Sequence, residues 1–253
     1  MSAVQQERRA SPGAAPPEPP DSTPGRPPGT FRTAGIILRK DLTLELRTLE
    51  TVPAMVLFSI TTFVIFHFAL NRSTIAGQLA AGILTGTLLF ASLLAINRLF
   101  VADREQGGFD GFLLAPVDRT ALLLGKGAAL LVYLAVLELF AIPAFALLLL
   151  TPSLGPHLPG LLLVLALADV ALAVIGTLVA AIAVHTRARD LIGPIIGLPL
   201  LLPALIGTAR GAGPLLARHG PALPPGKWLA IVALYDLVFA LLAYAVFDFL
   251  LED

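Results

Sequence analysis

The chain has 253 residues, of which 57% are hydrophobic and only 13% are charged, and its formal net charge is zero. A soluble domain carries about a quarter charged residues, so this composition indicates a protein embedded mainly in lipid. The neutral balance favours no nucleic-acid partner, and the lack of cysteine excludes disulfides, thiolate metal sites and covalent heme attachment through cysteine.

Residues 1–30 are a Pro- and Gly-rich segment that we expect to be a disordered cytoplasmic tail. Eight prolines lie between Ser11 and Gly29, where large apolar side chains are almost absent. Such a stretch cannot bury enough apolar surface to offset its ordering entropy. Arg8 and Arg9 are followed by prolines rather than by an apolar core, so no signal peptide is predicted here.

Residues 31–50 mix apolar and charged side chains, a pattern that predicts an amphipathic helix in the membrane interface. Isoleucines and leucines alternate there with five charged residues, namely Arg39, Lys40, Asp41, Glu45 and Arg47. Helices of this kind lie with their apolar side at the boundary between headgroups and acyl chains. The alternative is a solvated helix that leads into the membrane.

Residues 31–253 are predicted to form one membrane domain with six spans, because six apolar segments approach the roughly 20 residues that cross a bilayer. They run from Val52 to Leu70, Gly77 to Ile96, Thr120 to Leu150, Leu161 to Val184, Leu191 to Ala209, and Trp228 to Leu250. The fifth contains Pro194, Pro199 and Pro203, so we expect a broken helix packed against its neighbours. The predicted fold class is an all-α polytopic membrane protein.

The distribution of lysine and arginine predicts that both termini are cytoplasmic, in the inner membrane. An even number of spans places both termini on one side. With the N-terminus inside, ten basic residues fall in inner segments and four in outer ones, before three arginines of the tail are added. The positive-inside rule favours this orientation.

The cytoplasmic segment 97–119 mixes charged and bulky apolar residues, whereas a plain connector would be short and polar. Its pattern predicts two short helices with a hinge at Gly107-Gly108. We expect this segment to offer a membrane subunit's coupling site to a soluble motor protein. The candidate coupling residues are Arg98, Phe100, Asp103, Gly107, Asp110 and Pro116. The alternative is an interfacial loop that packs on itself.

Three acidic residues, Glu138, Asp169 and Asp236, fall inside the predicted spans. At 1.5 Å per residue, Asp169 and Asp236 lie about 12 Å below the outer surface and Glu138 about 20 Å below it. An unpaired carboxylate is costly in hydrocarbon, so these groups should be protonated, hydrogen-bonded or directed into a polar cavity. We predict that they line one outward-facing cavity or contact a partner subunit. The alternative is protonated acids hydrogen-bonded to neighbouring helices.

The sequence contains no phosphate-binding loop, because Gly125-Lys126 lacks the glycine at the required spacing and a following serine or threonine. Any ATP chemistry must therefore come from another chain. No nucleophile–base pair or metal cluster is apparent, so no enzyme activity is predicted. The histidines near the outer surface, His67, His157 and His219, are lone residues, so no bound heme is predicted.

Small residues in the second span predict close helix packing. Gly77, Gly82 and Gly86 lie on roughly one face of that helix, and the other small residues of the group are Ala76, Ala80, Ala81 and Ser92. Packing inside the monomer is favoured, and a homodimer through this face is the alternative.

Several positions in register resemble the CcmB family, the heme exporter protein B of cytochrome c maturation. They comprise the run FASLLAINRLF at 90–100, Asp103, Gly107, Asp110, Leu113-Leu114, Pro116, Lys126, Pro143 and the run LPLLLP at 198–203. The resemblance covers roughly residues 31–250. Asn97 departs from it, because the family usually has glutamate there, and Asp110 replaces a glutamate.

The resemblance implies a non-catalytic, ABC-2-like permease that works with the ATPase CcmA, the membrane proteins CcmC and CcmD, and the heme chaperone CcmE. Such a complex uses ATP to deliver heme to the periplasm or to release heme-loaded CcmE, so heme is cargo and ATP binds the partner subunit. Two alternatives stay open. One is a generic ABC-2 exporter of lipid, drug or polysaccharide, and the other is a membrane scaffold that translocates nothing.

Overall fold

The computed structural model describes residues 29–70, 74–101, 119–150, 154–184 and 189–250, and in these it is all-α. Six long helices are α2 (Thr51–Ala69), α3 (Gly77–Arg98), α6 (Arg119–Leu148), α7 (Leu158–Val184), α8 (Arg189–Leu215) and α9 (Gly226–Leu250). All six are long and apolar enough to cross a membrane, which confirms the predicted polytopic fold. Helix α1 (Thr30–Thr48) precedes them, and a single 3₁₀ turn, η1 (Gly155–His157), precedes α7.

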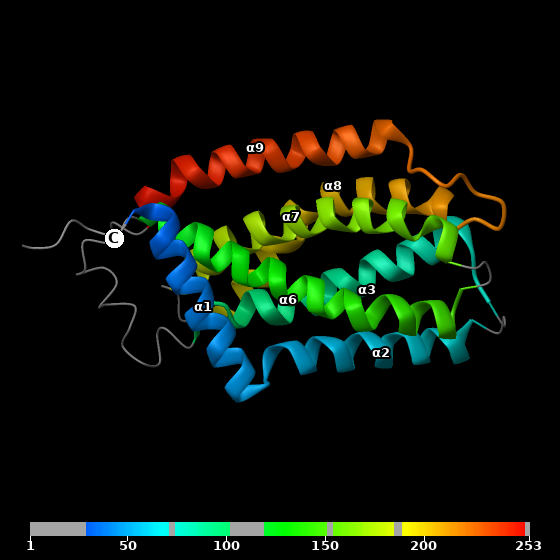
Figure 1. Cartoon of the computed structure of the whole chain (residues 1–253), viewed down its shortest axis with the longest axis horizontal. Coiled ribbons are helices and arrows are strands. Elements are labelled where there is room, and N and C mark those ends of the chain that lie inside the picture. Colours follow the sequence, from blue (N-terminus) through cyan, green and yellow to red (C-terminus); the bar gives the residue numbers. More distant parts are fainter. Residues whose placement is uncertain (1–28, 71–73, 102–118, 151–153, 185–188, 251–253) are drawn as a thin grey trace, which may run out of the picture.

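The six long helices run side by side, and α1 crosses one end of the bundle (Figure 1). We call this the α1 end and the opposite one the distal end. Helix α2 starts at the α1 end, and the direction alternates from there, so that α9 finishes at the α1 end (Figure 1). The beginning of the described chain and the last turn of α9 therefore share one end, as an even number of spans requires.

Helices α3 and α7 form the centre of the bundle. In the 18-residue apolar stretch of α3, 72% of the residues are buried. The corresponding share is 17% in α2 and in α9, which lie at the periphery. Helix α8 packs on both central helices, and α9 packs on α7. The two central helices also approach each other closely, because a Cβ atom at Gly176 of α7 would lie 2.8 Å from the Ile96 side chain. The peripheral helices expose leucine, isoleucine and phenylalanine, as lipid-facing surfaces do.

The prediction of a broken fifth span is wrong. Helix α8 is continuous from Arg189 to Leu215, although it contains Pro194, Pro199, Pro203 and Pro214. Each proline removes one backbone hydrogen bond, but neighbouring helices and local adjustment can compensate for it within a membrane protein. Packing of α8 against α3 and α7 agrees with the second half of that prediction.

The prediction of close packing inside the monomer is wrong for the α3 glycines, although Ala80, Ala81 and Ser92 of the same group are fully buried. A Cβ atom at Gly82 or Gly86 would meet nothing within 4 Å. Both glycines border a hollow of about 290 Å³ between α2 and α3, lined by Phe58, Phe66 and Phe90 among others. Their missing side chains open a groove on the surface instead of bringing two helices together. The homodimer stays a prediction.

Candidate coupling site and intramembrane carboxyl groups

Helix α1 docks on the first half of α6 with one face, which carries Ala34, Ile37, Asp41 and Glu45. Close approach depends on Gly125 of α6, where a Cβ atom would lie 2.8 Å from Ile37 Cβ and 3.0 Å from the Ala34 carbonyl oxygen. Two of the four residues on this face are acids, so the packed face needs polar partners as well as apolar ones.

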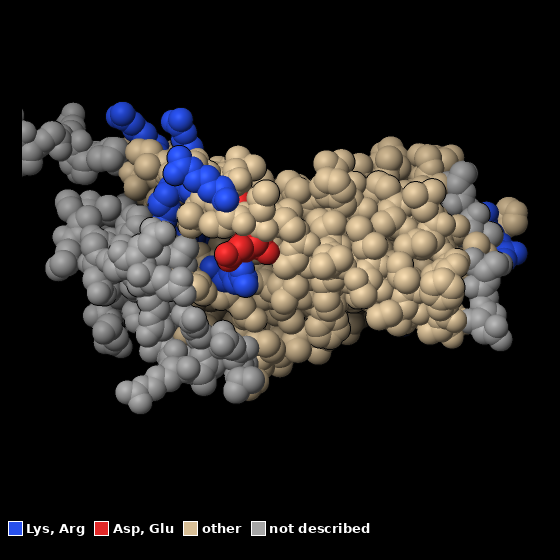
Figure 2. All heavy atoms as spheres, turned by 90° about the horizontal axis from the view of Figure 1, so that it is seen from below, with Lys and Arg blue, Asp and Glu red and all other residues tan. Residues whose placement is uncertain are grey.

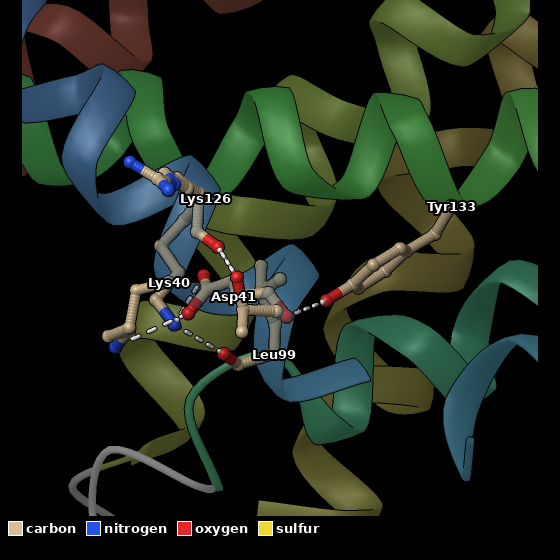
Figure 3. A network of polar contacts seen from close by, with 7 residues as sticks. Lys40, Asp41, Leu99, Lys126 and Tyr133 are labelled. Carbon is tan, nitrogen blue, oxygen red and sulfur yellow. Dashed lines mark hydrogen bonds and ion pairs between the residues drawn. The ribbon is translucent and has the colours of Figure 1, made fainter. Parts of the chain in front are cut away.

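Asp41 finds its partner in Lys126, the residue after Gly125. The Lys126 Nζ lies 2.9 Å from Asp41 Oδ2, and the two side chains are only 2% and 7% exposed. The same Nζ donates a hydrogen bond of 2.9 Å to the carbonyl oxygen of Leu99, and it lies 5.1 Å from the centroid of the Phe100 ring. Figure 3 shows Asp41 between Lys126 and Tyr133 of α6, with Leu99 beside the lysine.

Two further contacts hold Asp41 in place. Lys40 Nζ lies 3.3 Å from Asp41 Oδ1, and the Tyr133 hydroxyl donates to the Asp41 backbone carbonyl at 3.3 Å. We call Asp41, Lys126 and the Leu99 carbonyl the α1 joint. It connects α1, α6 and the end of α3 through charged groups that water scarcely reaches. Removal of one charge would leave the other buried without its partner, which makes the joint sensitive to single substitutions.

The corner between α1 and α2 is fixed by a second acid. Glu45 Oε1 accepts hydrogen bonds from the backbone amides of Thr51 and Val52 at 2.9 and 2.8 Å. A carboxylate is favourable at this position, because the first amides of a helix lack partners within it. Arg98, at the end of α3, pairs with Glu50 at 2.8 Å, but both side chains are exposed.

The structure locates two of the predicted coupling residues, Arg98 and Phe100, both at the α1 end. Asp103, Gly107, Asp110 and Pro116 lie outside the described residues, as does nearly all of the predicted tail. Asn97 contacts α8, where its side chain occupies the space that a Cβ at Gly193 would need. Sequence reasoning missed the pairing of Asp41 with Lys126, although it had noted both residues.

The three intramembrane acids are buried at one depth. Glu138, Asp169 and Asp236 are 8%, 8% and 6% exposed. Counted from the distal ends of α6, α7 and α9, each lies about 15 Å along its helix. Helix α7 contacts both α6 and α9. Lys126 cannot pair with Glu138, because it lies about 18 Å away along α6.

Two of these acids have an oxygen that lacks a hydrogen-bond partner. Within the described part of the chain, this holds for Glu138 Oε1 and Asp236 Oδ1. Buried polar atoms are rarely left so, and an exception calls for an explanation. The described neighbouring helices therefore donate no hydrogen bond to these two oxygens. The outward-facing cavity, or a partner contact, stays a prediction.

Two of the histidines considered as heme ligands have partners within the chain. A ring nitrogen of His67 lies 2.6 Å from the Leu148 carbonyl oxygen, and one of His157 lies 3.3 Å from that of Gly220. Both contacts tie segments together near the distal end. Groups of three or more histidine or acidic residues arranged to hold a metal ion do not occur among the described residues.

Comparison with known proteins gives one consistent result. The sequence profile of the CcmB protein family matches residues 32–249. The heme exporter protein B of Rhodobacter capsulatus is 32% identical over 78% of this chain and 92% of its own length. That of Pseudomonas aeruginosa is 29% identical over 83% and 92%, and that of Bradyrhizobium diazoefficiens is 33% identical over 67% and 76%.

Proposed function

This chain belongs to the CcmB family, and we propose from this premise that it is the permease subunit of an ATP-driven heme export complex in the inner membrane. The complex serves the maturation of c-type cytochromes. The chain itself catalyses no reaction. The partner ATPase CcmA hydrolyses ATP, and the membrane proteins CcmC and CcmD complete the assembly.

The α1 joint is the observation that carries the coupling part of this proposal. Leu99 and Phe100 lie near the start of the predicted coupling segment, 97–119. Lys126 contacts both of them and is ion-paired to Asp41. A displacement at the start of that segment would therefore be shared with α1 and α6, because the three elements meet at buried charges. This is how an ATPase bound on one side could act on the spans.

The distribution of charge supports a cytoplasmic α1 end. Among the described residues, exposed basic side chains at that end are Arg32, Arg39, Lys40, Arg47 and Arg98, whereas those at the distal end are Arg210, Arg218 and Lys227. Figure 2 shows Lys and Arg gathered largely toward the α1 end. With both termini in the cytoplasm, the ATPase would bind at the α1 end and the heme chaperone CcmE would act at the distal end.

The intramembrane acids are the candidate polar feature on the outward side. The common depth of Glu138, Asp169 and Asp236, and the unpartnered oxygens of the first and the last, support a polar cavity or a contact with a partner subunit. Either arrangement would provide the missing hydrogen-bond donors. We propose that the surroundings of these three acids change during the ATPase cycle. Helix α6 could transmit that change, because it carries both Lys126 of the α1 joint and Glu138.

Deletion of the gene tests the proposed function. A heme-stained gel reports the c-type cytochromes, and the same strain is assayed for the heme-bearing state of CcmE. We expect loss of the cytochromes with accumulation of heme-loaded CcmE. When the chain is supplied from a plasmid, the cytochromes should return and heme-loaded CcmE should fall to its wild-type level. Normal cytochromes in the deletion strain would contradict the proposal and favour a generic ABC-2 exporter.

A second measurement separates a permease from a scaffold. Membranes containing the complex are assayed for ATPase activity with the wild-type chain and with a Glu138→Ala, Asp169→Ala, Asp236→Ala variant. If the chain is a permease, we expect the triple variant to lose cytochrome maturation while the complex still assembles. Maturation and ATPase stimulation that both survive loss of all three acids would favour the scaffold.

A further inference from the structure

Helix α1 has a charge distribution that its sequence alone hides. The helix contains four basic residues, Arg32, Arg39, Lys40 and Arg47, and two acids. Both acids are turned toward the bundle, where Asp41 pairs with Lys126 and Glu45 caps α2, and Asp41 also lies 3.3 Å from the partly exposed Lys40. The basic residues are all exposed. The outward charge of α1 is therefore more positive than the sum over its residues.

Three rows of side chains cover most of the surface of α1, and the exposed Ile36 lies within the basic one. At about 100° per residue, the four basic residues fall within roughly 100° of one another, on the side away from α6. Between this basic row and the bundle lies an apolar row, which consists of Phe31, Leu38, Leu42 and Leu46. Phe31 and Leu46 are 85% and 75% exposed, whereas Leu38 and Leu42 pack partly against the core.

The placement of α1 favours a membrane as the partner of these two rows. Helix α1 lies across the end of the bundle and does not continue the direction of the apolar helices (Figure 1). If those helices span the bilayer, α1 lies along its surface. An apolar row next to a basic row is the arrangement by which helices insert at the level of the headgroups, and anionic lipids strengthen such binding. An acidic protein would neutralise the basic row but leave the apolar row uncovered.

We propose that the outer surface of α1 binds anionic phospholipid headgroups, with Arg32, Arg39, Lys40 and Arg47 at the phosphates and Phe31 and Leu46 among the upper acyl chains. The inference concerns binding and does not depend on heme export. The buried Asp41–Lys126 pair contributes to it, because an outward-facing Asp41 would repel the same headgroups.

Quenching of tryptophan fluorescence by brominated lipid tests the proposal, because the chain has one tryptophan, Trp228. The full chain carrying Trp228→Phe and Leu46→Trp is reconstituted in phosphatidylcholine vesicles that contain equal mole fractions of phosphatidylglycerol. Either the phosphatidylglycerol or an equal amount of the phosphatidylcholine is brominated. One basic side chain near an anionic surface contributes about 1 kcal/mol, which enriches the anionic lipid beside it by about fivefold at most. We expect brominated phosphatidylglycerol to quench at least about twofold more strongly.

A matched pair of variants assigns the effect to α1. Arg39→Gln with Arg47→Gln removes two of the four basic residues and should lower the quenching ratio, and high salt should bring it close to one. Arg210→Gln with Arg218→Gln removes two exposed charges from the distal end and should leave the ratio unchanged.

Three results would overturn the proposal. Equal quenching by both lipids in the parent protein would show no preference for anionic headgroups. A quenching ratio in the Arg39 and Arg47 variant that equals the parent's ratio would assign the preference to another surface. Equal quenching together with loss of ATPase-subunit binding in that variant would assign the basic row to a protein partner. Failure of the cytochrome test above would leave this measurement unaffected.

Discussion

Replacement of Lys126 by methionine tests the α1 joint most directly, because methionine retains much of the side-chain length and removes the charge. Removing one member of a buried ion pair destabilises a protein by about 3–5 kcal/mol. Lys40 would remain near Asp41, at 3.3 Å from Oδ1 and 42% exposed, so we expect the lower end of that range, about 3 kcal/mol. This loss of stability should affect mainly the docking of α1 on α6, so that the detached state of α1 becomes about 100-fold more populated.

Cysteine labelling measures this opening, because the chain contains no cysteine of its own. Ala34→Cys places a thiol on the buried face of α1, where the native residue is 9% exposed. We expect a water-soluble maleimide to label it up to about 100-fold faster when Lys126→Met is added. Arg98→Gln is the control, since the exposed Arg98–Glu50 pair contributes at most about 1 kcal/mol and should change the rate by less than about fivefold.

The double variant Asp41→Asn with Lys126→Met separates an unpaired buried charge from a change of shape. Because it leaves no charge without a partner, its labelling rate should lie nearer to that of the parent than the single Lys126→Met variant does. Labelling of Lys126→Met within about twofold of the parent would refute the reasoning. So would a double variant that labels as fast as the single one.

Three other predictions concern the α1–α2 corner, the α1–α6 contact and the acids. Glu45→Ala removes the acceptor for two amides and should destabilise the start of α2 by about 2 kcal/mol, measured as faster hydrogen exchange at Thr51 and Val52, with Glu45→Gln affected less. Gly125→Val should displace α1 and accelerate labelling of Ala34→Cys, and Ile37→Ala should partly restore the parent rate, because the clash is with Ile37. Single cysteines at Glu138, Asp169 and Asp236 should react with a membrane-impermeant thiol reagent from the distal side, whereas one at the lipid-exposed Leu139 should not. Failure of all three acid positions to react would contradict the cavity.

Most of the fold could be predicted because hydropathy alone decides where a chain crosses lipid. Each predicted span overlaps one of the six helices, and α1 begins at Thr30, next to its predicted start. The errors lie where a helix depends on its neighbours. The prolines of α8 suggested a break, but the sequence of α8 alone does not indicate that α3 and α7 pack against it. The glycines of α3 suggested contact, yet nothing in their spacing says that α2 leaves them uncovered.

The α1 joint was harder to predict than the spans, because it joins residues 85 positions apart in sequence. One signal was available. Asp41 and Glu45 lie on the same side of α1 as Ala34 and Ile37, at spacings of three and four residues. Acids on the apolar side of a helix imply inward-facing partners. The sequence does not say which partner, because Lys126 follows a glycine near the start of a span and looks like any basic residue that flanks a span.

The joint also explains why α1 can face two environments. A helix with four basic and two acidic residues would ordinarily present both signs of charge to its surroundings. Here the protein interior supplies Lys126 for one acid and the amides of α2 for the other. The contact that fixes α1 on the bundle is therefore the same contact that leaves its outer surface basic. A buried ion pair is weak evidence for stability, but it does specify one rotation of the helix. Rotation of α1 by half a turn would bury arginines and expose Asp41, so docking to α6 and binding to an anionic surface require one and the same orientation.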